Sequence, residues 1–267
     1  CSIHYFAFLT LVDLTRKKVL ITGAAGRIGT AAAHCALSAG ADLVISDISS
    51  HRLDTLRRHL TSKYSAAIYS VVVDITTQEG ISSLLSQAHE SAGLITSAVH
   101  SAYPVSASWG TRFEELKGQH LCQDLGAQLG GAILFSQQIL AYFQAHGGGD
   151  LVHLSSIQGI SAPKFDHYED TSMYSPVEYA AIKAGIISIT RWLAKYHANQ
   201  GIRVNCVSPG GILEGQPTVF LDRYRRSCTN IGMLNADQVA SAIVFLLSSQ
   251  AVAINGQNIV VDDGWSL

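Results

Sequence analysis

The sequence predicts one α/β domain built on a doubly wound parallel sheet with helices on both faces. The first observation is that short apolar runs, typical of buried strands, alternate with helical patterns through to the C-terminus. The second is a glycine-rich turn at residues 23–29, between the first strand and the first helix. The third is the length, because 267 residues suit a single domain of this class with a large core.

Strands are expected where short runs of branched apolar residues are bounded by glycine or polar residues. Two capping boxes, Thr76 with Glu79 and Asn235 with Gln238, predict the starts of two of the helices. We expect residues 1–16 to form an N-terminal arm and residues 17–267 the domain. Strands are predicted at residues 18–22, 42–47, 67–73, 94–99, 151–154, 202–207 and 258–261, and helices at 30–39, 50–64, 76–91, 126–143, 179–199 and 235–249.

Two long segments, residues 160–176 and 210–234, show no regular pattern. Both follow the ends of predicted strands, at the edge where open α/β sheets bind their ligands. Loops of this length are usually functional or mobile. Either segment could therefore be a substrate lid.

The glycine turn predicts a Rossmann-type dinucleotide site. Gly23 permits the tight turn, Gly26 lets the backbone approach a pyrophosphate, and Gly29 lets the helix pack closely on the strand. The helix that follows offers free backbone N–H groups and the positive end of its dipole to the phosphates.

Asp47 ends the second predicted strand, 24 residues after Gly23, where a carboxylate can accept the ribose hydroxyls of an adenosine. This position favours NAD over NADP, because a carboxylate facing a 2′-phosphate is a like-charge contact. At ~4 Å and an effective dielectric of about 20, one such pair costs about 4 kcal/mol. Arg27 and Arg52 could offset part of that cost.

Tyr179 and Lys183 are one helical turn apart and share a face. An ammonium beside a phenol favours the phenolate, so we expect Lys183 to lower the pKa of Tyr179 and to let it exchange a proton near neutral pH. Downstream of a dinucleotide turn, the pair indicates proton transfer coupled to cofactor chemistry.

The composition excludes several classes of protein. With a net charge of −2, nothing points to nucleic acid or to an anionic membrane surface. The five cysteines and eleven histidines are scattered without metal-ligand spacing, which predicts no metal site and reduced thiols in the cytoplasm. The apolar run at residues 3–12 is too short to span a membrane. Charged residues are only 14%, so we expect apolar surface to be buried between subunits.

Five segments taken in order resemble the short-chain dehydrogenase/reductase family: residues 22–29, Asp74, residues 155–159, Tyr179 with Lys183, and residues 203–210. Within that family, residues 171–183 and 254–264 resemble the flagellin modification protein A group, which is linked to bacterial surface-sugar biosynthesis. The resemblance covers nearly the whole chain.

The resemblance implies a role for each matched residue. Tyr179 would be the general acid and base, and Lys183 would also bond the nicotinamide ribose. Ser156, with Ser155 as the fallback, would bond the substrate oxygen, and Gln128 would stand where a helix asparagine completes the usual catalytic tetrad through its main-chain carbonyl. Asp74 would contact the adenine. The remaining expected cofactor contacts are Gly23, Gly26, Arg27, Ile28, Gly29, Asp47, Pro209, Gly210 and Ile212.

The chain also departs from the family pattern. Residues 100–103 read His-Ser-Ala-Tyr where the family commonly has Asn-Asn-Ala-Gly. Gln128 replaces the asparagine, and its longer side chain could alter the helix kink. Glu214 stands near a position where many members carry a threonine beside the cofactor phosphates, so a carboxylate there is unfavourable unless it points away.

Three functions follow from these residues. The leading one is an NAD(H)-dependent oxidoreductase that interconverts a secondary alcohol and a ketone on a small molecule, with a sugar-derived substrate of surface-glycan biosynthesis as one candidate. The second is a cofactor-binding but catalytically silent partner subunit. The third is an epimerase or dehydratase that retains its NAD. We expect a homodimer or homotetramer, assembled through the helices at 126–143 and 179–199.

Overall fold

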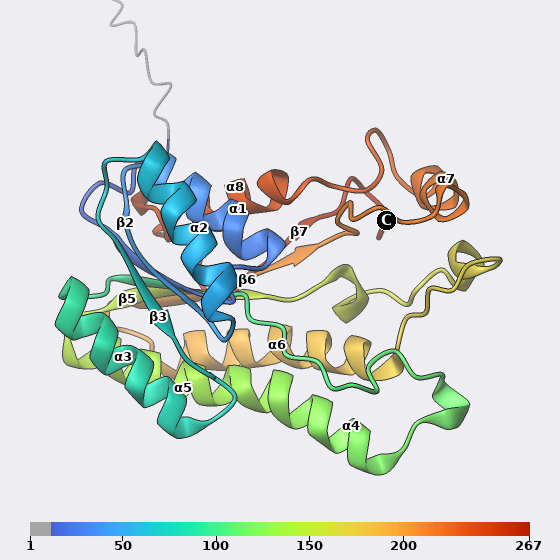
Figure 1. Cartoon of the computed structure of the whole chain (residues 1–267), viewed down its shortest axis with the longest axis horizontal. Helices are drawn as coiled ribbons and strands as arrows, with labels where there is room; N and C mark the ends of the chain where they lie inside the picture. Colours follow the sequence, from blue (N-terminus) through green and yellow to red (C-terminus); the bar gives the residue numbers. More distant parts are fainter. Residues whose placement is uncertain (1–11) are drawn as a thin grey trace, which may run out of the picture.

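The computed structural model describes residues 12–267, which form a seven-stranded parallel sheet with helices on both faces (Figure 1). The strand order is β3-β2-β1-β4-β5-β6-β7. The chain places β2 and β3 on one side of β1 and then returns to place β4 to β7 on the other side, so the strand order switches between β1 and β4. The predicted doubly wound sheet is confirmed. The strands are β1 (Lys18–Thr22), β2 (Asp42–Asp47), β3 (Ile68–Val72), β4 (Ser97–His100), β5 (Gly149–Leu154), β6 (Ile202–Pro209) and β7 (Asn258–Val261).

The helices lie in two layers, as Figure 1 shows: α1, α2 and α8 cover one face, and α3, α5 and α6 cover the other. Their bounds are α1 (Arg27–Ser38), α2 (Ser50–Lys63), α3 (Gln78–Ala92), α4 (Gly118–Leu125), α5 (Gly131–Ala145), α6 (Val177–Tyr196), α7 (Thr218–Arg226) and α8 (Ala236–Leu247). Shorter helical turns are η1 (Phe113–Glu115), η2 (Gly126–Gly130), η3 (Ile157–Gly159), η4 (Phe165–Tyr168) and η5 (Ser249–Ala251).

The alternation of side chains along β1 divides the core between the two layers. Val19 and Ile21 face the layer of α1 and α8, whereas Leu20 faces the layer of α3 and α5. All three are fully buried. Burying each such side chain stabilises the fold by roughly 1.5–3 kcal/mol. The packed core fixes the strand ends, and so positions the loops that follow them.

The helix predicted at 126–143 is longer than expected, and its start was wrong. It begins at Gly118, and the backbone stays helical through the π-helical turn η2 into α5. The polar residues of α4 hid this helix because its exposed side chains weaken the apolar pattern. The segment 210–234, expected to be irregular, likewise contains α7.

One of the two predicted capping boxes is wrong. Thr77, not Thr76, caps α3 by accepting a hydrogen bond from the backbone N–H of Gly80 at 3.0 Å. Thr76 instead donates its hydroxyl and its backbone N–H to Asp74. The box of Asn235 and Gln238 at the start of α8 is confirmed.

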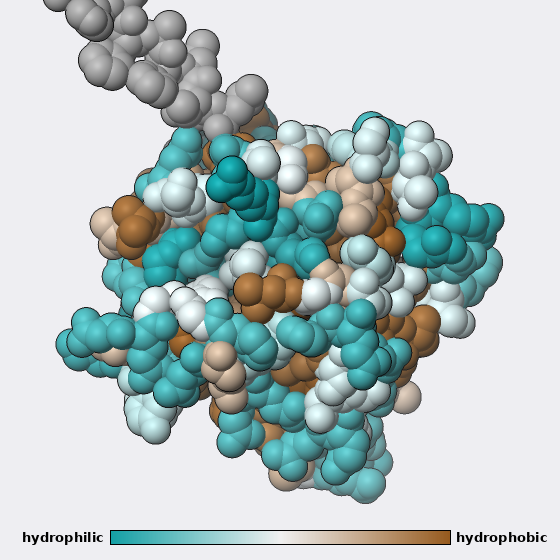
Figure 2. Space-filling view, turned by 90° about the vertical axis from the view of Figure 1, so that its left-hand side faces the viewer, coloured by the Kyte–Doolittle hydropathy of each residue, from teal (hydrophilic) through white to brown (hydrophobic). Residues whose placement is uncertain are grey.

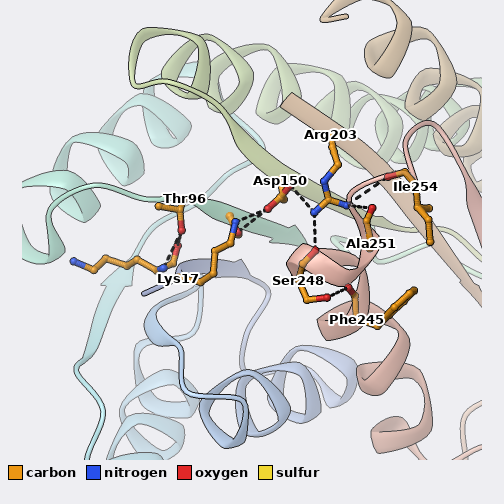
Figure 3. Close-up of polar contacts among 10 residues, drawn as sticks. Lys17, Thr96, Asp150, Arg203, Phe245, Ser248, Ala251 and Ile254 are labelled. Carbon is orange, nitrogen blue, oxygen red and sulfur yellow. Dashed lines mark hydrogen bonds and ion pairs between the residues drawn. The ribbon is translucent and has the colours of Figure 1, made fainter. Parts of the chain in front are cut away.

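A buried ion network ties the amino ends of the strands together (Figure 3). Asp150 at the start of β5 lies 2.7 Å from the Nζ of Lys17 and 2.8 Å from Arg203. Arg203 also donates to the carbonyl oxygens of Ser248 and Ala251. The surface at this end of the sheet is mostly hydrophilic, with hydrophobic residues in small groups (Figure 2).

The predicted N-terminal arm falls mainly on residues 1–11, which lie outside the described residues. Of the described remainder, Leu14 is fully buried in the core and donates its N–H to Ala39. The boundary between arm and domain at residues 16 and 17 stays a prediction.

Candidate active site

A cavity of about 750 Å³ opens at the carboxyl ends of the strands. The glycine turn and the ends of β2 to β6 line it, together with segments from 160–176 and 210–234 and the C-terminal tail. Figure 1 shows α7 and the C-terminus on this side of the molecule. Every predicted site residue except Gln128 lines the cavity.

The glycine turn has the geometry that a dinucleotide site needs. Gly23 adopts a positive φ of 64°, and a Cβ there would lie 2.6 Å from the Cα of Ala102. A Cβ on Gly29 would lie 2.4 Å from the carbonyl oxygen of Gly23, so only glycine lets α1 start this close to the turn. Helix α1 begins at Arg27, three residues earlier than predicted, and no described side chain caps it. Its first N–H groups therefore suit a phosphate group.

Asp47 lies at the end of β2, on the same wall of the cavity. Its carboxylate accepts hydrogen bonds from the backbone N–H of Ala25 at 3.2 Å and of Ser49 at 3.0 Å. Arg52 approaches it to 3.4 Å and remains largely exposed. The carboxylate is thus fixed beside the glycine turn, with one largely exposed cation next to it.

Arg27 and Glu214 form an ion pair across the mouth of the cavity. An unpaired carboxylate at Glu214 would repel cofactor phosphates, but the guanidinium of Arg27 offsets its charge. Both side chains are about half exposed, so solvent screens the pair. The pair joins the glycine turn to the segment 210–234.

The other predicted cofactor residues follow strand ends on the same side. Asp74 comes after β3, is exposed, and has its carboxylate engaged by Thr76. Pro209 ends β6, and the backbone N–H of Gly210 bonds Val261 at 2.8 Å. Ile212 and Ile28 also line the cavity.

Tyr179 lies in the first turn of α6, where its ring faces the end of β5 and Ser156. Burial raises the pKa of Tyr179 above its ordinary value, and a hydrogen bond with Ser156 opposes that shift. The predicted lowering by Lys183 is therefore wrong in direction for the protein alone, because desolvation outweighs the other contributions. Ser156 and Tyr179 nonetheless line the same cavity.

Lys183 lies one turn further along α6 and is 6% exposed. Its Nζ donates to the carbonyl oxygen of Leu154 at 3.0 Å and lies 5.5 Å from the ring centroid of Tyr179. Burial lowers the pKa of Lys183 to about 8, because a charged amine is poorly solvated there. A proton on this amine can therefore be released near neutral pH.

Ser155, the fallback for Ser156, has a different contact. Its hydroxyl donates to the carbonyl oxygen of Lys183 at 2.7 Å, which holds β5 against α6. Close packing of Gly159 supports the same contact, because a Cβ there would lie 2.7 Å from the carbonyl carbon of Lys183. The geometry therefore favours Ser156 as the hydroxyl that meets a ligand.

Gln128 lies in the π-helical turn η2 and is 5% exposed. Neither atom of its side-chain amide finds a hydrogen-bond partner among the described residues. Turns of this type are frequent at functional sites because they free backbone groups. The expected role of its main-chain carbonyl stays a prediction.

His100, a departure from the family pattern, is buried beneath the site rather than exposed to the cavity. Its ring stacks on Phe135 at 4.8 Å, and its Nδ1 lies 3.1 Å from the hydroxyl of Thr22. Burial holds the pKa of His100 well below its usual value and lowers that of the neighbouring His153 to about 4. Both rings are therefore neutral packing groups at neutral pH.

Two aromatic residues beside Tyr179 were not predicted. The ring of Tyr103 lies 5.8 Å from that of Tyr179, and the ring of Trp109 lies 6.0 Å from it. The only signal in the sequence was the tyrosine at 103 where the family commonly has glycine. In the segment 160–176, Tyr168 lines the cavity, while Tyr174 accepts a hydrogen bond from the backbone N–H of Phe113.

Within residues 12–267, no group of His, Cys, Asp or Glu side chains is arranged to hold a metal ion. The four cysteines in that range are free. None of the helices described is long and apolar enough to cross a membrane.

Comparison with known families agrees with this geometry. Residues 23–266 match the family model described as enoyl-(acyl carrier protein) reductase. The chain is 40% identical to the post-translational flagellin modification protein A of Campylobacter coli over 255 residues, which are 95% of this chain and all of that protein.

Solved structures show the same fold. A short-chain dehydrogenase of Leptospira borgpetersenii with bound NAD⁺ aligns with a TM-score of 0.81 and 28% identity, over 96% of this chain and 94% of that one. The L-sorbose reductase of Gluconobacter frateurii, solved with NADPH and L-sorbose, aligns with a TM-score of 0.83 and 23% identity, over 96% and 98% of the two chains. Structures of this fold thus occur with either nucleotide.

Proposed function

The chain belongs to the short-chain dehydrogenase/reductase family and is an oxidoreductase, and from this premise we propose that it interconverts a secondary alcohol and a ketone with NAD(H). One observation carries the proposal. Ser156, Tyr179 and Lys183 line the same cavity as the glycine turn, so a carbonyl group and a nicotinamide could meet there. When bound, the nicotinamide ring supplies or accepts the hydride.

In the direction of reduction, the residues of the chain handle the oxygen and the proton. Ser156 donates a hydrogen bond to the carbonyl oxygen, and Tyr179 transfers its phenolic proton to that oxygen as charge develops. Lys183, protonated below about pH 8, stabilises the phenolate that remains. Oxidation of the alcohol uses the same steps in reverse.

The preference for NAD over NADP is part of the proposal. Asp47 is held beside the glycine turn by the backbone of Ala25, where its charge opposes a 2′-phosphate. Arg52 is the one cation in contact with that carboxylate among the described residues. Its charge is already offset by Asp47, which supports the preference for NAD.

A sugar-derived substrate of surface-glycan biosynthesis is the candidate favoured by the similarity to a flagellin modification protein. Residues 209–212, with Asp74 and Ile28, would contact the cofactor rather than this substrate. Cytoplasmic localisation remains a prediction from the sequence.

We further propose a homodimer or homotetramer assembled through α5 and α6. Ile133 on α5 and the stacked pair of Trp192 and Tyr196 on α6 expose large apolar surfaces, with Tyr196 65% exposed. Light scattering at micromolar concentration tests this proposal, and a monomer would refute it.

Titration with NADH and NADPH, followed by a panel of neutral ketones, tests the proposed function. We expect tight binding of NADH, weaker binding of NADPH, and consumption of NADH with at least one ketone. Binding without turnover of any ketone or alcohol would favour a catalytically silent partner subunit. Conversion of a substrate with no net change in free NADH would favour an epimerase or dehydratase.

A further inference from the structure

The cavity is divided by charge into two halves. Arg27, Asp47, Arg52, Asp74 and Glu214 all lie around the nucleotide half. Around the catalytic hydroxyls, Lys183 is the one Lys, Arg, Asp or Glu side chain among the described lining residues, and its amine is engaged by the carbonyl of Leu154. A carboxylate or phosphate near the reacting carbon would find no unengaged cation in that half.

The substrate half is instead walled by aromatic rings. The first group, the loop cluster, consists of Tyr103, Trp109 and Tyr179, with ring centroids 5.5–6.0 Å apart in edge-to-face arrangements. Tyr103 and Tyr179 line the cavity, and Trp109 packs against both of them. The Nζ of Lys183 lies 5.2 Å from the ring centroid of Tyr103. Tyr103 therefore packs against both predicted proton-transfer residues.

The loop that carries Tyr103 is anchored on both sides of it. The hydroxyl of Ser101 donates to the carbonyl oxygen of Thr22 at 2.6 Å. Ser106 donates its N–H and its hydroxyl to the buried carboxylate of Asp124, both at 2.9 Å. Tyr103 nonetheless keeps 45% of its surface exposed, so an anchored ring presents free surface to the cavity.

A second group, the tail cluster, lines the same cavity and consists of Tyr168, Phe220, Tyr224 and Trp265. Tyr224 stacks on Trp265 at 5.8 Å, and Phe220 lies 5.2 Å from Tyr168. Lys164 is not among the residues that line the cavity; its amine donates to the carbonyl oxygen of Trp265 and lies 4.7 Å from the centroid of that ring. The tail cluster therefore adds apolar wall and no lining charge.

Resting on the proposed function, we propose that Tyr103 is a specificity-determining residue that packs against an uncharged ring carrying the reacting carbon. Flat aromatic walls contact the apolar face of a cyclic alcohol or ketone over more area than they contact an open chain. The substrate class is thus a neutral cyclic alcohol or ketone, such as a sugar or alicyclic ring. Charged groups of a larger substrate would lie outside this half.

The test compares three ketones with NADH: cyclohexanone, the open-chain ketone of the same carbon number, and cyclohexanone carrying a carboxylate opposite the carbonyl. We expect Tyr103→Ala and Tyr103→Leu to raise KM for cyclohexanone about tenfold, and KM for the open chain no more than about twofold. Tyr103→Phe keeps the aromatic ring and should retain the preference for cyclohexanone over the open-chain ketone. The Kd for NADH should be unchanged in all three variants, which separates the effect from cofactor binding.

An unchanged ring-to-chain ratio in both Tyr103→Ala and Tyr103→Leu would overturn the inference, as would equal turnover of the carboxylated ring. Failure of the proposed function is distinct, because no ketone would then consume NADH. In that case calorimetric titration of the same three compounds into the protein–NADH complex decides the matter. Binding of cyclohexanone that weakens in Tyr103→Ala supports the inference, and no such binding contradicts it.

Discussion

Buried charged side chains have many partners at the amino end of the sheet and few at the carboxyl end. At the amino end, Asp150 has two cationic partners, and Arg203 is bonded by backbone carbonyls as well (Figure 3). At the carboxyl end, Lys183 has a single carbonyl partner, and no carboxylate pairs with it among the described residues. The paired charges of Asp150 and Arg203 hold the strands together at the amino end. At the carboxyl end, the poorly solvated amine of Lys183 can release its proton more easily than an exposed lysine.

The largest expected effect is on catalysis at the carboxyl end. Tyr179→Phe removes the proposed proton donor, so turnover should fall by about 10²-fold or more, while NADH binding is retained. Tyr142→Phe is the matched control, because Tyr142 bonds His89 and the backbone of Ile95 away from the cavity. Steady-state kinetics measures both variants, and equal turnover rates would contradict the proposed role of Tyr179.

The amino end should show a large effect on stability instead. Asp150→Asn leaves Lys17 and Arg203 without their carboxylate, which should lower the free energy of unfolding by about 3 kcal/mol. Asp54→Asn removes two exposed ion pairs on α2, with Arg57 and Arg58, and should change it by no more than about 1 kcal/mol. Urea denaturation measures both, and similar small losses would show that the network does not hold the strands.

The cost of burying Lys183 should appear as a dependence of stability on pH. Below about pH 8 the amine is protonated in the folded and unfolded states, and its burial cost is fully present. Between about pH 8 and its ordinary pKa of 10.5, the unfolded state binds more protons, so stability rises with pH. From pH 7 to pH 10, wild type should gain about 2 kcal/mol relative to Lys183→Met.

Lys63→Met serves as the control for this measurement, because Lys63 is exposed at the end of α2. Its difference from wild type should stay constant over the same range of pH. A constant difference for Lys183→Met as well would mean that the amine is better solvated than its 6% exposure indicates.

The smallest effect is expected at the mouth of the cavity. Glu214→Gln breaks the ion pair with Arg27. Because both side chains are about half exposed, the free energy of unfolding should change by less than about 1 kcal/mol. The freed guanidinium should strengthen binding of NADH a few-fold. Calorimetry with Glu214→Gln tests this, and weaker binding would indicate that the pair itself shapes the nucleotide site.

The features that the sequence predicted are those that depend on residues close together in the chain. Strand runs such as residues 18–22 and the tight turn at Gly23 follow from local patterns, and both were confirmed. The family resemblance, rather than a local pattern, indicated Ser156, Tyr179 and Lys183, and the structure brings all three to one cavity.

What depends on distant packing was not predicted. The upward shift in the pKa of Tyr179 arises from burial by several elements together. Tyr103 and Trp109 lie beside Tyr179 on a loop that Ser106 anchors to Asp124 on α4. Helix α4 was not predicted because its side chains are mostly polar or exposed, with Asp124 as its one buried residue.

The most direct test of hydride transfer at the carboxyl end uses NADH deuterated at both positions of its reacting carbon. The protein is incubated with this cofactor and cyclohexanone, and the alcohol is analysed by mass spectrometry. The proposed function predicts one deuterium on the carbinol carbon and an equal amount of oxidised cofactor, with the rate of both lowered by about 10²-fold or more in Tyr179→Phe. Alcohol without deuterium, or deuterium transfer that persists undiminished in Tyr179→Phe, would contradict it.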